Sequence, residues 1–281
     1  MAEKETFTIH NSEVVIELHQ KTHKYRVSEN SGKPFYAPSV TTILNSLAKP
    51  ALVPWNVKVC CDYIYDNLQS LLAGDSFSVE KVFKIIEQAR EAPEYERKKA
   101  AEIGTAAHDW LESYWLSVTR QTPIPKLPEE GPVRNCVDAA MSWIKDHDMV
   151  PILFERPFYS RLHKFTGKED FVGVVDGNLA VIDYKSSKAI YPETALQTAA
   201  YAKMYEEEFG RPVTHRWALK LGKYDGKVEP KPYPPDTLEP DYDTFLAVFK
   251  IYDRLKHLRR KPKPETEPQP KAEKVDYLAE L

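Results

Sequence analysis

Apolar and polar side chains alternate over the first 30 residues, in stretches such as FTIH, EVVIEL and KYRV. A period of two is typical of strands, so this segment is expected to form a meander of short strands. The pattern then changes at PSVTTILNSL, where Ser39 can accept a backbone hydrogen bond at the start of a helix. We therefore expect a helix to begin near Val40.

Helical spacing dominates the chain from there to residue 145. Apolar residues recur every three or four positions over residues 55–71 and 79–91, which predicts two amphipathic helices. A third, long helix is expected over Glu94–Val118, with Pro93 placed near its start, where proline is tolerated. After the proline-rich joint TPIPKLPEEGP, another helix is expected over Val133–Lys145.

The second half mixes strands with helices. Four segments are strand-like, PILFERPFYS, DFVGVV, LAVIDYK and HRWALKL, and helices are expected over Glu193–Glu208 and Tyr242–Arg259. This order predicts an α/β core with a helical annex. We divide the chain into residues 1–130, a core over 131–260, and a charged, proline-rich tail over 261–281 that is expected to be disordered. The closing VDYLAEL is either a docking peptide or a frayed end.

Composition narrows the function classes only slightly. The chain has 281 residues, of which 42% are hydrophobic and 29% charged, as in a protein with a substantial core. No apolar run is long enough to span a membrane, and the N-terminus lacks a secretory or transit signal, so a cytoplasmic location is expected. Three cysteines without a CxxC pair argue against a zinc site or an iron–sulfur cluster. A net charge of −3 neither indicates nor excludes a nucleic-acid binder.

The stretch GVVDGNLAVIDYK carries the most specific chemistry. Asp176-Gly177 favours a two-residue hairpin turn, in which Val175 pairs with Asn178. Asp183 then lies opposite Asp170, with Cβ atoms roughly 5 Å apart on one face of the sheet. A turn centred on Gly177-Asn178 is the alternative; it would place Asp170 opposite Lys185, still on the Asp183 face. Asp176 lies about five strand residues from Asp183, roughly 16 Å, and is interpreted as a turn residue.

Lys185 follows Asp183 by two residues and therefore points to the same face. Two carboxylates and a lysine can bind a hard cation and place an ammonium beside it, which suits hydrolysis of a phosphate ester. A salt bridge on a polar hairpin face is the alternative. The apolar neighbours of Asp183 indicate a buried strand, where charged groups without a chemical role would be costly.

These residues belong to a set of four motifs that resembles the PD-(D/E)xK nuclease superfamily, in its RecB-like branch. In chain order the motifs are G-x-x-x-H at Gly104–His108, G-x-x-D at Gly167–Asp170, D-x-K at Asp183–Lys185, and Q-x-x-x-Y at Gln197–Tyr201. Near the N-terminus, PSVTTIL is similar to a segment of standalone exonucleases of phages and of mitochondrial genome maintenance. The resemblance implies a restriction-endonuclease-like core, a mixed sheet flanked by helices, with a largely helical N-terminal extension.

The sequence departs from the family pattern in two respects. Lys168 and Glu169 replace the usual apolar pair before the aspartate, and Gly173–Asp176 fits the same motif better by its apolar middle. The hairpin geometry nevertheless favours Asp170. The iron–sulfur cysteines of some relatives and any P-loop or helicase motif are absent, so no cluster and no nucleotide cofactor are expected.

The resemblance assigns roles to these residues. Asp170, Asp183 and Lys185 are the expected catalytic residues, and the expected ligands of Mg²⁺ or Mn²⁺ are His108, Asp170, Asp183 and the Tyr184 carbonyl. Gly104 would let its helix approach the sheet closely. The remaining candidates are those for substrate binding, Gln197, Tyr201, Ser39, Thr41 and Lys188, and two carboxylates, Glu112, interpreted as solvated, and Glu155, equally a site residue or a surface acid. Further basic candidates for DNA contact are Lys220, Lys223, Arg254, Lys256, Arg259, Arg260, Lys261 and Lys263.

The resulting hypothesis is a metal-dependent DNA nuclease of a bacterial or phage-infected cell, acting as an exonuclease on single strands or DNA ends in replication, recombination or repair. A flap endonuclease and a catalytically inactive nucleic-acid-binding subunit are the alternatives. Expected partners are DNA and a recombinase, helicase or single-strand-binding protein, and no membrane.

Overall fold

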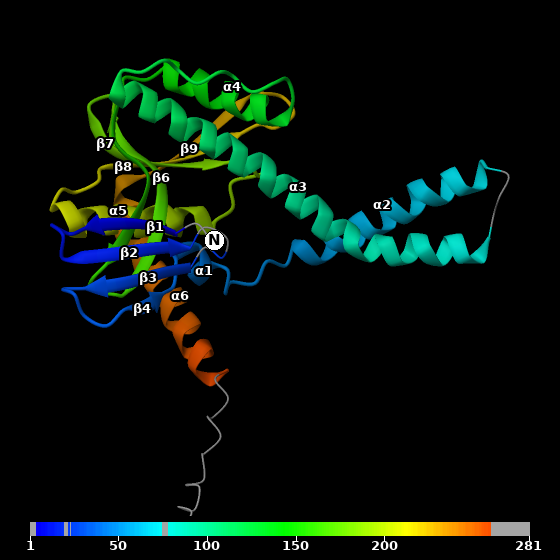
Figure 1. The fold of residues 1–281 in the computed structure, drawn as a ribbon, viewed down its shortest axis with the longest axis horizontal. Coiled ribbons are helices and arrows are strands. Elements are labelled where there is room, and N and C mark those ends of the chain that lie inside the picture. Colours follow the sequence, from blue (N-terminus) through cyan, green and yellow to red (C-terminus); the bar gives the residue numbers. More distant parts are fainter. Residues whose placement is uncertain (1–3, 20–21, 23, 75–77, 260–281) are drawn as a thin grey trace, which may run out of the picture.

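The computed structural model describes residues 4–19, 22, 24–74 and 78–259, and it begins with the predicted meander (Figure 1). Its strands pair antiparallel in chain order. Buried and partly exposed side chains alternate along the second strand, which explains the alternation of apolar and polar residues in its sequence. The strands are β1 (Lys4–Ile9), β2 (Val14–His19), β3 (Lys24–Glu29) and β4 (Phe35–Ala37).

Helix α1 (Val40–Leu44) follows directly and confirms the predicted cap, because Ser39 Oγ accepts a hydrogen bond of 3.1 Å from the Thr42 amide. The segment before it is tied to the second half of the chain. The Thr166 amide donates to the Pro38 carbonyl at 2.9 Å, and Ser39 forms a bridge with Thr166.

Helices α2 (Leu52–Leu72) and α3 (Val79–Arg120) form a hairpin that projects from the body of the molecule (Figure 1). The expected helix start at Pro93 is wrong, because α3 runs through this residue without ending. An interior proline costs about 3 kcal/mol, since it removes one backbone hydrogen bond. Ala89, Ala92 and Pro93 are buried where α2 and α3 pack, and this packing outweighs the local cost.

The second sheet has the order β5-β6-β7-β8-β9, in which only β7 and β8 pair in parallel. Strand β9 was not expected, because its sequence VEPKPY holds two prolines, and proline is confined to edge strands such as this one. The elements are α4 (Pro132–Lys145), β5 (Met149–Ser160), β6 (Phe165–Val175), β7 (Asn178–Lys185), α5 (Glu193–Phe209), β8 (His215–Leu221), β9 (Val228–Tyr233), a 3-10 turn (Pro235–Thr237) and α6 (Leu238–Leu258).

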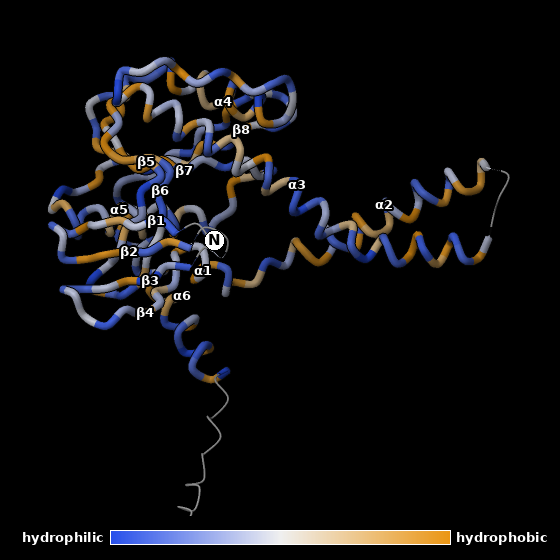
Figure 2. Tube along the Cα trace, viewed as in Figure 1, coloured by the Kyte–Doolittle hydropathy of each residue, from blue (hydrophilic) through white to orange (hydrophobic). Residues whose placement is uncertain are grey.

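Helices cover both faces of this sheet. Trp115 of α3 and Trp143 of α4 pack with Phe171 and Ile182 on one face, whereas α1, α5 and α6 cover the other, where Phe165 is buried. Apolar positions therefore recur along every element of the core (Figure 2). The expected mixed sheet flanked by helices is confirmed.

None of the helices in the described ranges is both long and apolar enough to cross a membrane. The predicted disorder of residues 261–281 and the role of VDYLAEL lie outside the described residues. The division at residue 130 stays a prediction.

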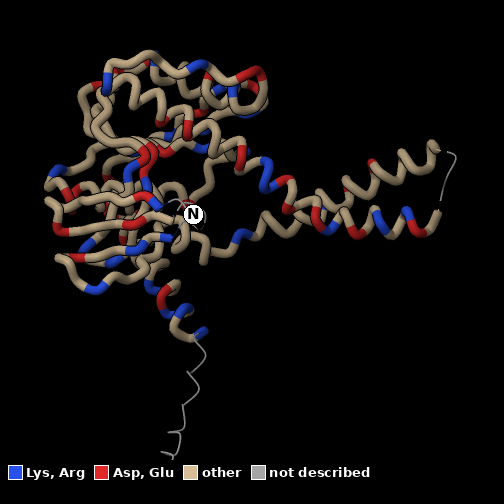
Figure 3. The backbone as a smooth tube through the Cα atoms, viewed as in Figure 1, with Lys and Arg blue, Asp and Glu red and all other residues tan. Residues whose placement is uncertain are grey.

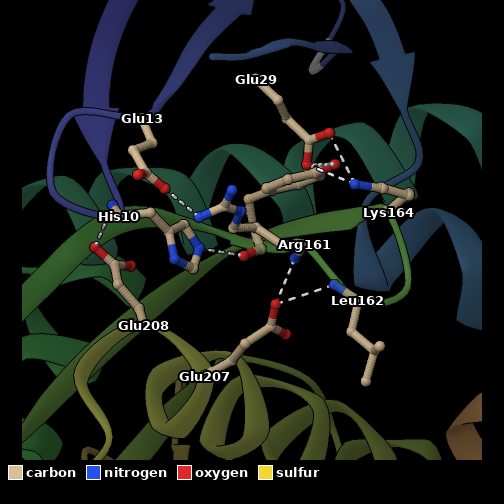
Figure 4. A network of polar contacts seen from close by, with 9 residues as sticks. His10, Glu13, Glu29, Arg161, Leu162, Lys164, Glu207 and Glu208 are labelled. Atoms are coloured by element: carbon tan, nitrogen blue, oxygen red, sulfur yellow. Dashed lines mark hydrogen bonds and ion pairs between the residues drawn. The ribbon is translucent and has the colours of Figure 1, made fainter.

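A polar network fixes the first sheet on the second (Figure 4). The His10 ring contacts the Tyr159 carbonyl at 2.8 Å, and Tyr159 donates to Glu29, which also accepts from Lys164 at 2.6 Å. Glu208, at the end of α5, accepts from the His10 amide at 3.3 Å and from Arg156 at 2.5 and 3.1 Å. The network therefore ties the first sheet to β5, to the end of α5 and to the turn before β6. The same view shows Glu13 paired with Arg161, and Glu207 accepting from the amides of Arg161 and Leu162.

Glu208→Ala should lower the free energy of unfolding by about 2–4 kcal/mol, because it leaves the half-buried Arg156 guanidinium and the His10 amide without their acceptor. Denaturant unfolding followed by circular dichroism measures this. The matched control is Glu239→Ala, which removes an exposed ion pair with Lys203 and should cost less than about 1 kcal/mol. Equal effects of the two substitutions would contradict the structural role of Glu208.

Candidate functional site

A cavity of about 380 Å³ opens at the end of β7 and beside the middle of β6, and it is also lined by residues of α1, α3 and α5. Most of the predicted site residues line it, although they are spread over residues 39–201. The lining consists of Tyr25, Ser39, Thr41, His108, Lys168, Asp170, Asp183, Tyr184, Lys185, Ser186, Ser187, Gln197 and Tyr201.

The hairpin register confirms which aspartate belongs to this cavity. Val175 pairs with Asn178, and Asp176 and Gly177 between them have φ angles of +48° and +80°, as a two-residue turn requires. Asp176 is half exposed in the turn, where its Oδ1 accepts from the Asp148 amide at 2.9 Å. Pairing continues to Phe171 and Ile182, so one step further Asp170 comes level with Asp183.

Asp183 and Lys185 form one part of the site. Lys185 Nζ lies 2.9 and 2.7 Å from the two carboxylate oxygens of Asp183 and donates to Gln197 Oε1 at 3.0 Å. Gln197 Nε2 in turn lies 3.5 Å from the Tyr201 hydroxyl, one turn further along α5. The Q-x-x-x-Y pair therefore fixes the lysine, and the lysine holds the buried Asp183.

His108, Glu155 and Asp170 form the other part. His108 Nδ1 lies 3.2 Å from Asp170 Oδ1 and 3.3 Å from Glu155 Oε1, and one ligand atom from each residue falls within 4.8 Å of the others. The second oxygen of Asp170 accepts from the Tyr184 amide at 2.7 Å. One nitrogen and two carboxylate oxygens at this spacing could hold a divalent metal ion.

Glu155 lies opposite Asp170, at an irregular point of β5. Its φ of +47° is rare for a residue with a side chain, and regular pairing with β6 is interrupted between Phe154–Phe171 and Arg156–Glu169. Strain of this kind costs about 1–3 kcal/mol and persists where the surroundings impose it. The Glu155 carboxylate also pairs with Lys168. Sequence reasoning left Glu155 undecided, because the pairing of β5 with β6, which places it opposite Asp170, could not be derived from the local pattern.

Burial and crowding of carboxylates set the ionisation of the site. Burial raises the pKa of Asp183 to about 6, although Lys185 beside it acts in the opposite direction. Burial also raises the pKa of Asp170, but the nearby His108 outweighs it and lowers that pKa below the usual value. Burial opposes charge on His108 too, yet Asp170 and Glu155 hold its pKa well above 6.5.

Two motif glycines permit close packing around the cavity. A Cβ at Gly104 would lie 2.8 Å from Ser186 Oγ, so the glycine lets α3 approach the loop after β7, as expected. A Cβ at Gly167 would lie 2.3 Å from Cε1 of Tyr201, so this position admits no side chain unless the tyrosine moves. Space is therefore more restricted at Gly167, which faces a buried ring, than at Gly104, which faces a serine hydroxyl that can rotate.

The other candidates are distributed unevenly. Ser39 and Thr41 line the cavity, whereas Lys188 is exposed and does not. Glu112 is half-buried rather than solvated, and burial together with Glu155 raises its pKa. Lys220 pairs with Glu229. Residues that sequence reasoning did not single out for the site are Tyr25, Lys168, Ser186 and Ser187; only Lys168, beside the aspartate of a motif, carried a signal.

A comparison with known families identifies the family of this chain. The model of the PD-(D/E)XK nuclease superfamily matches residues 76–273, which include every motif from His108 to Tyr201. No curated protein matches the chain. The mixed sheet with helices on both faces is consistent with the restriction-endonuclease-like fold of such nucleases. The chain belongs to the PD-(D/E)XK nuclease superfamily.

Proposed function

We propose that the protein is a metal-dependent deoxyribonuclease that removes nucleotides from single strands or DNA ends. The proposal rests on two sets of charged side chains that line one cavity. A nitrogen and carboxylate cluster at His108, Glu155 and Asp170 lies beside a buried aspartate and lysine pair, Asp183 and Lys185. We propose Mg²⁺ or Mn²⁺ as the metal, because a mixed nitrogen and oxygen donor set suits both ions.

Different residues of the chain would bind the metal, orient the water and position the lysine during hydrolysis. A bound divalent ion supplies polarisation of the scissile phosphate and a lower pKa for an attacking water. Asp170 would hold the ion, with His108 and either Glu155 or the predicted ligands Asp183 and the Tyr184 carbonyl. Lys185 would orient the water or neutralise charge that develops on the phosphate. Gln197 and Tyr201 would keep the lysine in place.

Cleavage of linear single-stranded DNA, but not of circular single-stranded DNA, is the expected outcome of incubation with Mg²⁺ or Mn²⁺. An exonuclease needs a free end, and EDTA should abolish the reaction because the metal is required. Gel electrophoresis of the two substrates measures this. Nicking of circles or of flaps would instead establish an endonuclease, and no metal-dependent cleavage of any substrate would overturn the proposal.

Asp170→Asn should reduce cleavage at least about 100-fold, because the proposed ligand loses its charge. Asp176→Asn should leave cleavage within about twofold of the wild type, because asparagine keeps both the left-handed turn conformation and an acceptor for the Asp148 amide. Initial rates of cleavage of a labelled oligonucleotide measure both variants. If Asp176→Asn lost activity while Asp170→Asn kept it, the assignment of the hairpin aspartates would be wrong.

Metal binding at pH 7 should release about one proton, since the pKa of His108 lies well above 6.5 and a ligating histidine must be neutral. The pairing of protonated His108 with Asp170 and Glu155 stabilises the metal-free protein fully below about pH 6.5, and this stabilisation is lost as the pH rises through the pKa of the folded state. Metal affinity should therefore increase with pH.

Calorimetric titration with Mn²⁺ in two buffers of different ionisation enthalpy measures the released proton. His108→Gln should abolish the release while leaving the fold intact by circular dichroism. Proton release that persists in this variant would assign the effect to another group.

A further inference from the structure

A second cavity, of about 400 Å³, lies between the first sheet and α6. It is lined by aromatic and basic side chains from three separate parts of the chain, β4, the turn before β6, and the second half of α6. The lining residues are Phe35, Tyr36, Pro38, His163, Lys164, Phe249, Lys250, Asp253 and Lys256.

The two cavities share the same two pieces of backbone. One piece contributes Tyr36 and Pro38 to the second cavity, then Ser39 and Thr41 to the candidate active site. The other contributes His163 and Lys164 to the second cavity, then Lys168 and Asp170 to the active site. The pieces are joined midway, where Thr166 bonds to the Pro38 carbonyl and bridges Ser39. The second cavity therefore continues the line of the active site along β6.

Aromatic surface is available in the second cavity. Tyr36 is 59% exposed and makes no ring contact within the described part of the chain. Two other aromatic rings of the lining are held in place, because His163 stacks on Phe165 and meets Tyr242 edge-on, and Phe249 packs against Phe165. The exposed ring of Tyr36 offers a stacking surface for a base.

The charge of the cavity is favourable for phosphate. Among the described residues, Lys250 and Lys256 form no ion pair, and Lys256 contacts only the ring of Tyr252. Lys164 is paired with Glu29, and the one acid in the lining, Asp253, lies 3.4 Å from His257. Basic residues continue to the end of α6, where Figure 3 shows blue positions gathered. These exposed residues are Arg254, Lys256, His257 and Arg259.

We propose that this second cavity is an accessory site for the single strand of DNA that the active site cleaves, with Tyr36 stacking on a base and Lys250 and Lys256 binding phosphates. The inference rests on the proposed nuclease function and adds a site to it. Stacking on an aromatic ring and pairing with lysine are tolerant of sequence, as degradation of a strand requires.

The distance between the two cavities fixes the length of strand involved. Lys164, in the turn before β6, and Lys168, within β6, are four residues apart, at most about 13 Å at ~3.3 Å per residue. At ~3.4 Å per stacked nucleotide, this corresponds to about four nucleotides between the scissile phosphate and the accessory site. Substrates shorter than this cannot occupy both cavities.

Binding is tested first, by fluorescence anisotropy with a labelled single strand of about 15 nucleotides in EDTA, where no cleavage occurs. Tyr36→Ala should weaken binding roughly tenfold, the effect of losing one stacked base. Lys250→Glu with Lys256→Glu should make the slope of log affinity against log salt shallower by about 1.4, since each phosphate contact to a single strand contributes about 0.7. Controls of matched chemistry are Tyr224→Ala, an exposed tyrosine outside both cavities, and Lys126→Glu with Lys145→Glu.

Cleavage supplies the second readout. In the wild type, kcat/KM should be larger for a strand of about 15 nucleotides than for one of about 2, and Tyr36→Ala should reduce this ratio about tenfold through KM. Unchanged affinity, salt slope and length preference in the cavity variants would overturn the accessory site while leaving the nuclease proposal standing. Tyr36-dependent binding by a wild-type protein that cleaves no strand would support the accessory site and overturn the nuclease proposal instead.

Discussion

The register of the β6–β7 hairpin is the constraint on which the rest of the site depends. Asp176 and Gly177 adopt left-handed backbone conformations, which fixes a two-residue turn and therefore every pairing from Val175–Asn178 to Phe171–Ile182. A shift of one residue would send each side chain to the opposite face of the sheet. Asp183 would then point away from α5, whose Gln197 accepts from Lys185, and toward the apolar cluster that packs under α3.

Buried carboxyl groups gather at this end of the sheet, and only some of them have a cationic neighbour. Glu155, Asp170 and Asp183 each have a cationic neighbour, in Lys168, His108 and Lys185 respectively. Glu169 is buried with both carboxylate oxygens lacking a hydrogen-bond partner, and burial raises its pKa well above the usual value. An excess of buried carboxyl groups favours a cation, which agrees with the divalent metals that nucleases of this superfamily generally use.

The first sheet takes part in the candidate site although it lies outside the core. The polar network at His10, Glu29 and Glu208 holds it against β5, β6 and the end of α5, and the segment after β4 then runs along β6 past both cavities. The same anchoring brings Tyr25 and Ser39 to the candidate active site and Tyr36 to the second cavity. One attachment thus supplies residues to both cavities.

The sequence by itself determined the features that arise within a few residues. Alternation and helical spacing identified most elements, and the Asp-Gly turn indicated the hairpin register that places Asp170, Asp183 and Lys185 together. The resemblance of the motifs to a nuclease family added His108 to this set. Tertiary structure decided what depends on distant partners. Packing against α2 carried α3 through Pro93, an edge position admitted the prolines of β9, and a strained Glu155 joined His108 and Asp170. Local patterns cannot show these outcomes, because contacts from elsewhere in the chain offset each local cost.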